Sequence, residues 1–224
     1  MMTIRDIRNL SFIFISMFIF GYPIWIQHIY MLTVGFALIH EAGIEISFVA
    51  LSYNPLFALS IIIVFFFGIG LYKFGIELSE NTLRVGGIFL SISQLSFFFL
   101  IQIATRIKIT ILLPIYIANI LVLILGSLSV ILIMSGLANL YELSRRPEFI
   151  VAAIIYYLLP MIALPMAGIG ILRSIKIAKN IPEDKLKIIK EKAKKVISWK
   201  YLFLMNLQRE IGLPPLIIWI AMKS

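Results

Sequence analysis

The sequence predicts an all-α fold: a polytopic transmembrane helix bundle that carries a basic amphipathic C-terminal helix. Of the 224 residues, 61% are hydrophobic and only 14% are charged, whereas about a quarter of the residues of a soluble domain are charged. The mean hydropathy of +1.03 leaves too little polar surface to cover a water-soluble core. The apolar residues also gather in long runs, so we expect lipid to surround most of the chain.

Five apolar runs are long enough to cross a bilayer, which takes about 20 residues of helix. The first contains Pro23 and is expected to form one tilted or kinked helix. The fifth contains Pro160 and Pro165, which we expect to bend it and to mark a kink or a pore-lining position. The predicted spans are residues 10–39, 55–71, 85–104, 109–140 and 149–172, within a transmembrane domain of residues 1–173.

Residues 174–200 are predicted to form a basic amphipathic helix at the membrane interface. Pro182 suits the first position of a helix, and apolar residues such as Leu186 and Ile189 recur at helical spacing. Such a helix lies on an anionic membrane surface or against a partner, and the alternative is a solvated helix that caps the domain. The predicted membrane-surface residues are Lys185, Lys187, Lys190, Lys192, Lys194 and Lys195.

The last segment, residues 201–224, consists of two apolar pieces that are each shorter than a span. Arg209 and Glu210 divide them, followed by Pro214 and Pro215. Because a charged pair is costly in the middle of a bilayer, an interfacial or re-entrant segment is favoured over a short sixth span.

Lys and Arg accumulate on the cytoplasmic side of membrane proteins. With five spans, the loop around Arg106 and Lys108 falls on the same side as the tail, and together they hold most of the basic residues. The rule then places the C-terminal tail in the cytoplasm and the N-terminus outside.

Small residues in the predicted spans indicate helix packing, because they let backbones approach each other. A substrate-sized groove is the alternative reading. The segments that begin at Gly68 (GIGLYKFGIEL) and Gly168 (GIGILRSIKIA) also resemble each other, which indicates either an internal repeat of the kind found in transporters or helix exits of similar composition. The predicted packing residues are Gly68, Gly70, Gly86, Gly87, Ser91, Ala163 and Ala167.

Chemically reactive residues are sparse. The chain has no cysteine, and no Asp, Glu, Lys or Arg lies in the middle of a predicted span, which argues against a proton-coupled antiporter and a membrane hydrolase. Asn119 is a possible pore residue. His28 and His40 are expected at the headgroup level. His40 with Glu41 and Glu45 would make a metal site if they shared a helix face, the alternative being a solvated loop; we predict no catalytic residue, metal or cofactor.

The function that these features favour is a non-catalytic subunit of a larger complex, multi-pass in the cell membrane, that gives packing, anchoring and docking. Its expected partners are a bilayer with anionic headgroups and other membrane subunits or a second copy. No specific nucleic acid is expected, because lysines without interleaved arginine and aromatic residues form a generic basic surface. The alternative is a small-solute transporter or pore-forming component, as a monomer or an oligomer. An intramembrane enzyme that acts on lipid has least support. The Ile- and Lys-rich, Cys-free composition resembles that of thermophilic archaeal membrane proteins.

Overall fold

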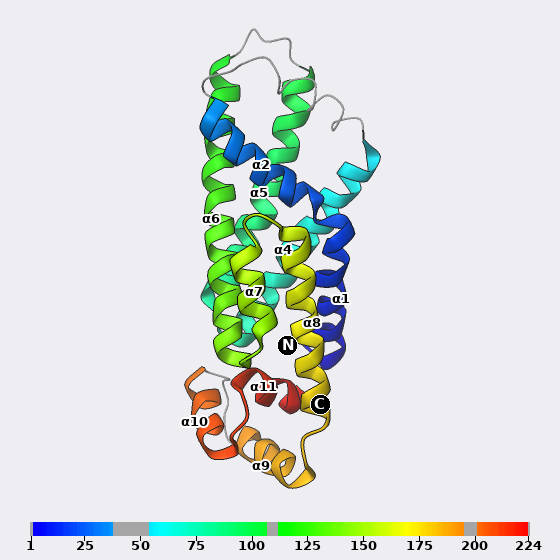
Figure 1. Ribbon diagram of the computed structural model, residues 1–224, viewed down its shortest axis with the longest axis vertical. Coiled ribbons are helices and arrows are strands. Elements are labelled where there is room, and N and C mark those ends of the chain that lie inside the picture. The colour runs from blue at the N-terminus through cyan, green and yellow to red at the C-terminus, as the bar shows by residue number, and fades with distance from the viewer. Residues whose placement is uncertain (1, 38–53, 107–111, 195–200, 224) are drawn as a thin grey trace.

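A computed structural model describes residues 2–37, 54–106, 112–194 and 201–223, and every regular element in those ranges is an α-helix. Most of the long helices run along the axis of an elongated bundle (Figure 1). In chain order the helices are α1 (Ile4–Phe20), α2 (Tyr22–Ala37), α4 (Pro55–Leu78), α5 (Asn81–Arg106), α6 (Leu112–Ser144), α7 (Pro147–Ile155), α8 (Pro160–Lys179), α9 (Glu183–Lys194), α10 (Tyr201–Ile211) and α11 (Pro215–Lys223).

Four single helices are long and apolar enough to cross a membrane: α4, α5 over Asn81–Leu100, α6 over Ile120–Ser144, and α8. The first apolar run is divided at Gly21, where α1 and α2 meet at an angle of 55°. This bent pair would make a fifth candidate if it counts as one span. The predicted count of five spans is therefore not confirmed.

The fifth predicted run, residues 149–172, is not one kinked helix. It contains a break at residues 156–159, and Pro160 occupies the first turn of α8, where its missing N–H costs nothing. The two helices pack against each other as an antiparallel hairpin. An ion pair between Glu148 at the start of α7 and Arg173 near the end of α8 shows this arrangement. Proline here ends one helix and starts the next, which reverses the chain.

Both ends of the described chain lie at the same end of the bundle, together with α9, α10 and α11; we call it the basal end, and the opposite end the apical end (Figure 1). The backbone N–H of Met2 and the ammonium group of Lys223 both bond to the carboxylate of Glu77. The structure therefore places the N-terminus and the tail at one end of the bundle, whereas the sequence-based topology places them on opposite sides of the membrane. That topology assumes that residues 149–172 cross the membrane, whereas the α7–α8 hairpin returns to the end that it left.

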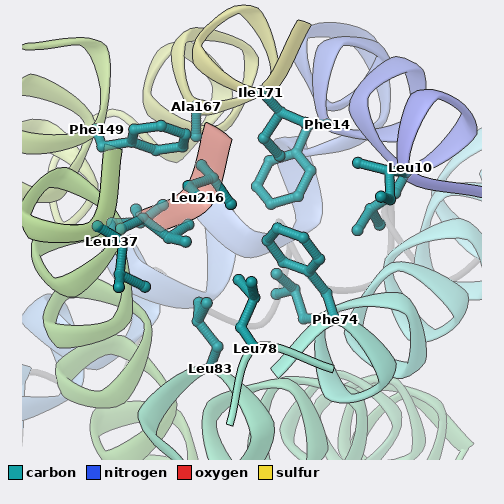
Figure 2. Close-up of a cluster of buried hydrophobic side chains, with 14 of the residues drawn as sticks. Leu10, Phe14, Phe74, Leu78, Leu83, Leu137, Phe149, Ala167, Ile171 and Leu216 are labelled. Atoms are coloured by element: carbon teal, nitrogen blue, oxygen red, sulfur yellow. The ribbon is translucent and has the colours of Figure 1, made fainter. Parts of the chain in front are cut away.

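The C-terminal helix α11 closes the basal end of the bundle. All its residues from Pro215 to Ala221 are buried, and a helix that is apolar on every side belongs in a core. Figure 2 shows Leu216 among side chains that converge from the surrounding helices, including Phe14 of α1, Phe74 of α4 and Leu137 of α6. With 9 residues, α11 is too short to span a bilayer and instead fills the space between the ends of longer helices.

The basic helix α9 packs beneath α11 through the fully buried Ile189. Two of its lysines hold α10 in place. Lys185 donates to the carbonyl oxygen of Ile211 over 3.4 Å, and Lys192 forms an ion pair with Glu210. Helices α9, α10 and α11 together form the basal platform of the molecule.

Candidate functional site

Three of the predicted packing residues meet at the seam between α4 and α5. A Cβ atom added to Gly87 would lie 2.7 Å from the backbone nitrogen of Tyr72, and one added to Gly68 would overlap Ser91. The Ser91 hydroxyl donates across the seam to the carbonyl oxygen of Phe65 over 2.9 Å. The small residues therefore allow the two backbones to approach closely enough for a direct hydrogen bond between the helices.

The other predicted packing residues lie at different seams. Gly86 faces α6, where an added Cβ would lie 3.1 Å from the Cβ of Leu132, and Gly70 faces Leu10 of α1. Ala163 and Ala167 are buried on α8, and Figure 2 shows Ala167 beside the ring of Phe149. The seven residues serve several separate helix contacts and do not line one common groove.

The two similar segments occupy comparable places in the fold. Both lie in the basal halves of helices that run toward the basal end, α4 and α8 (Figure 1). In each segment, the first glycine lies against another helix. Gly68 lies against α5, and Gly168 lies against α1, where an added Cβ atom would be 2.8 Å from the Cβ of Phe14.

The tip of the α7–α8 hairpin brings polar groups into the interior of the bundle. From Arg173 to Pro160 is a rise of about 20 Å along α8, so the tip lies well above the charged basal end. Tyr156 at the tip is fully buried, and its hydroxyl has no hydrogen-bond partner within the described part of the chain. A helix end also leaves carbonyl groups without intrahelical partners, so the tip needs donors from elsewhere.

His28 of α2 supplies one of these donors. Its Nδ1 lies 2.9 Å from the carbonyl oxygen of Tyr157, and because a carbonyl only accepts, Nδ1 carries the proton and Nε2 is the acceptor of the neutral ring. The imidazole stacks on the ring of Tyr157 at 5.9 Å and meets Tyr156 edge-on at 5.5 Å. His28 is 3% exposed. His28 is therefore buried inside the protein, which the sequence does not predict.

The neighbouring residue Gln27 connects α2 to α5. Its side-chain oxygen accepts from the amide nitrogen of Gln94, and its own amide nitrogen lies 3.5 Å from the carbonyl oxygen of Ser93. Both glutamines are buried, and the side-chain oxygen of Gln94 has no hydrogen-bond partner among the described residues. Helix α2 therefore carries polar groups on two faces, one toward the hairpin tip and one toward α5.

This arrangement provides hydrogen-bond donors and acceptors but no carboxylate or ammonium group. A buried polar atom without a partner costs about 1–3 kcal/mol, and the Tyr156 hydroxyl and the Gln94 oxygen are two such atoms in the described part of the chain. Within the described ranges, no group of three or more His, Cys, Asp or Glu residues is placed to hold a metal ion.

The remaining predicted residues are placed as follows. Pro165 lies inside α8, one turn beyond the tip. Lys187 and Lys190 are exposed on α9, whereas Lys185 and Lys192 contact α10. The side chains of Asn119 and Lys194 are outside what the structure describes, and so are His40, Glu41, Glu45 and Lys195 as whole residues.

Sequence reasoning does not identify the hairpin tip or the role of His28. The available signal is Tyr156 and Tyr157 in the middle of an apolar run directly before LLP, because a buried tyrosine hydroxyl usually needs a polar partner. The sequence matches no protein-family model, no curated protein and no solved structure.

Proposed function

We propose that the chain is a non-catalytic integral membrane subunit that docks a partner protein on its basal platform and lies in the cell membrane with that platform in the cytoplasm. The observation that carries this proposal is the closed basal end: α11 is buried on every side and fills the bundle, while α9 and α10 cover it from below. Because the basal end of the bundle is filled with side chains, it suits a structural component that binds its partner on the outer surface.

The charge distribution supports the orientation. Within the described part of the chain, the one basic residue at the apical end is Arg106, the last residue of α5; the others lie toward the basal end. The basic residues of the N-terminus, the α4–α5 turn and the α6–α7 turn lie at the same end of the bundle as the tail, which supports a stronger charge bias than the sequence alone predicts. By the positive-inside rule this side faces the cytoplasm.

The exposed lysines of α9 are the docking surface in this proposal. Lys187 and Lys190 face away from the bundle, and the described structure gives neither an acidic partner. A basic surface that the protein itself does not neutralise suits an acidic partner or anionic headgroups.

Purification from native membranes in mild detergent tests the proposal. We expect the full-length chain to co-purify with at least one other protein at fixed stoichiometry, and the double substitution Lys187→Glu with Lys190→Glu to reduce that recovery. Arg84→Glu, a charge reversal at the α4–α5 turn, serves as the control and should leave the recovery unchanged. A chain that purifies alone under these conditions would contradict the proposal.

A second candidate function, transport of a small polar solute, is favoured by one observation. The hairpin tip is a discontinuous helix whose carbonyl group is held by His28, and transporters often build solute sites where helices are interrupted. In this case the purified chain would reconstitute solute flux without other proteins, and His28→Ala would abolish it. Trp25→Ala, on the exposed side of the same helix, would not.

A further inference from the structure

We propose that the basal end of the seam between α1 and α4 binds a phospholipid with an amine headgroup, the phosphate beside Lys73 and the ammonium group beside Asp6. A hollow of about 510 Å³ lies there. Its volume is in the range of small-molecule sites. It is lined by Met2, Asp6, Lys73, Ile76 and Glu77.

Lys73 and Asp6 carry opposite charges and line the same hollow, yet they form no ion pair with each other in the described structure. One carboxylate oxygen of Asp6 accepts from the backbone and hydroxyl of Thr3 over 2.8 and 2.9 Å, and no described residue donates to the other oxygen. The bonds from Thr3, together with the charge of Arg5, lower the pKa of this exposed carboxyl. The ammonium group of Lys73 has no acceptor among the described residues. Two opposite charges held apart in one hollow are complementary to a ligand that carries both.

The third charged residue of the hollow is already engaged. The Glu77 carboxylate accepts from Lys223 over 3.0 Å and from the backbone of Met2 over 2.8 Å. These bonds neutralise it and fix one wall of the hollow. Lys73 and Asp6 therefore remain as the two groups that would select a ligand.

The surface above the hollow favours a lipid over a water-soluble zwitterion. On α4, Phe66 and Ile62 lie on the same exposed face as Lys73 and are 62% and 51% exposed. Phe66 is about 10 Å from Lys73 along the helix axis, toward the apical end. On α1, Ile13 lies two turns above Asp6 and is 37% exposed. A headgroup in the hollow would thus place its acyl chains along these apolar side chains, at the depth where the charged basal end gives way to hydrocarbon.

Retention of lipid by the purified full-length protein tests this site. The protein is reconstituted in bilayers with equal amounts of phosphatidylethanolamine and phosphatidylglycerol and re-extracted in mild detergent, and the lipid that stays bound is quantified by mass spectrometry. We expect phosphatidylethanolamine to be enriched. Lys73→Gln and Asp6→Asn should each lower its retention by about threefold, the scale of one exposed charge contact. Lys187→Gln, which removes an exposed lysine of α9, should not change it.

Three results would overturn the proposal. Equal retention of phosphatidylglycerol would show that the headgroup amine is not recognised. Unchanged retention in Lys73→Gln would show that the lipid binds elsewhere; this variant decides the matter even if Asp6→Asn unfolds, because Lys73 has no described polar partner to lose. Binding of free phosphoethanolamine without retention of the phospholipid would assign the hollow to a soluble zwitterion.

Discussion

Lys223 and Glu77 are 146 residues apart in the sequence and form an ion pair of 3.0 Å that fastens α11 to the end of α4. The Lys223 side chain is 6% exposed and that of Glu77 is 15% exposed. The ammonium group also lies 5.6 Å from the centre of the Trp219 ring. The pair therefore joins the last described helix to α4, a candidate span in the first half of the chain.

Breaking this ion pair should destabilise the protein. Lys223→Met removes the Lys223 cation from the Glu77 carboxylate in a largely buried position, and we expect a loss of about 2 kcal/mol, less than for a fully buried pair because Glu77 keeps some solvent and its bond from Met2. Thermal unfolding in detergent, followed by tryptophan fluorescence, measures it. Lys187→Met is the control. Combining Lys223→Met with Glu77→Gln should cost less than the sum of the single losses, and strict additivity would contradict the coupling.

Adding one carbon atom at the α4–α5 seam should lower the stability of the protein, whereas adding one on the exposed face of α5 should leave it unchanged. Gly87→Ala places a methyl group against the backbone of α4, and forced separation of packed elements costs about 1–3 kcal/mol. Val85→Ile adds a carbon at a position that is 36% exposed and serves as the control. The same thermal unfolding experiment compares the two variants. Equal stability of both would show that the seam is looser than described.

His28→Ala should loosen the hairpin tip. Without the imidazole, the Tyr157 carbonyl loses its donor, and a lost hydrogen bond of about 1 kcal/mol raises local opening roughly fivefold. Hydrogen–deuterium exchange of peptides covering residues 154–163, read by mass spectrometry, reports this directly. Trp25→Ala, on the exposed side of α2, should leave exchange at the tip unchanged. Unaltered exchange in His28→Ala would mean that the tip is held by packing alone.

The topology can be tested with single cysteines, because the natural chain has none. Cysteines at Arg5 and at Asn180, both exposed toward the basal end, should react with a membrane-impermeant maleimide from the same side of the membrane. A cysteine at Asn54, directly before α4, should react from the other side. If Arg5→Cys and Asn180→Cys label from opposite sides in intact cells, the hairpin is wrong and residues 149–172 form a crossing.

The sequence predicts the helices whose apolar runs are continuous. The runs at 55–71, 85–104 and 109–140 lie largely within α4, α5 and α6, since a long apolar segment in lipid has to satisfy its backbone hydrogen bonds as a helix. Small residues within them likewise indicate where helices approach, as at Gly87, although the partner helix follows only from the fold.

The sequence does not distinguish a kinked span from a hairpin in residues 149–172. Proline is compatible with both, as a bend inside a helix or as the first residue of a new one. The decision depends on tertiary contacts such as Glu148 with Arg173, and these are 25 residues apart. The burial of His28 is missed for the same reason. An imidazole toward the end of an apolar run suggests an interfacial position, and only the fold shows that His28 packs against the hairpin tip.

The position of α11 also has a consequence for biogenesis. The helices that surround it precede it in the chain, so they are synthesised while Leu216 and Trp219 have yet to be translated. During that interval the apolar side chains that later pack around Leu216 and Trp219 lack these partners. The core at the basal end is therefore completed late, when the C-terminal segment has been synthesised.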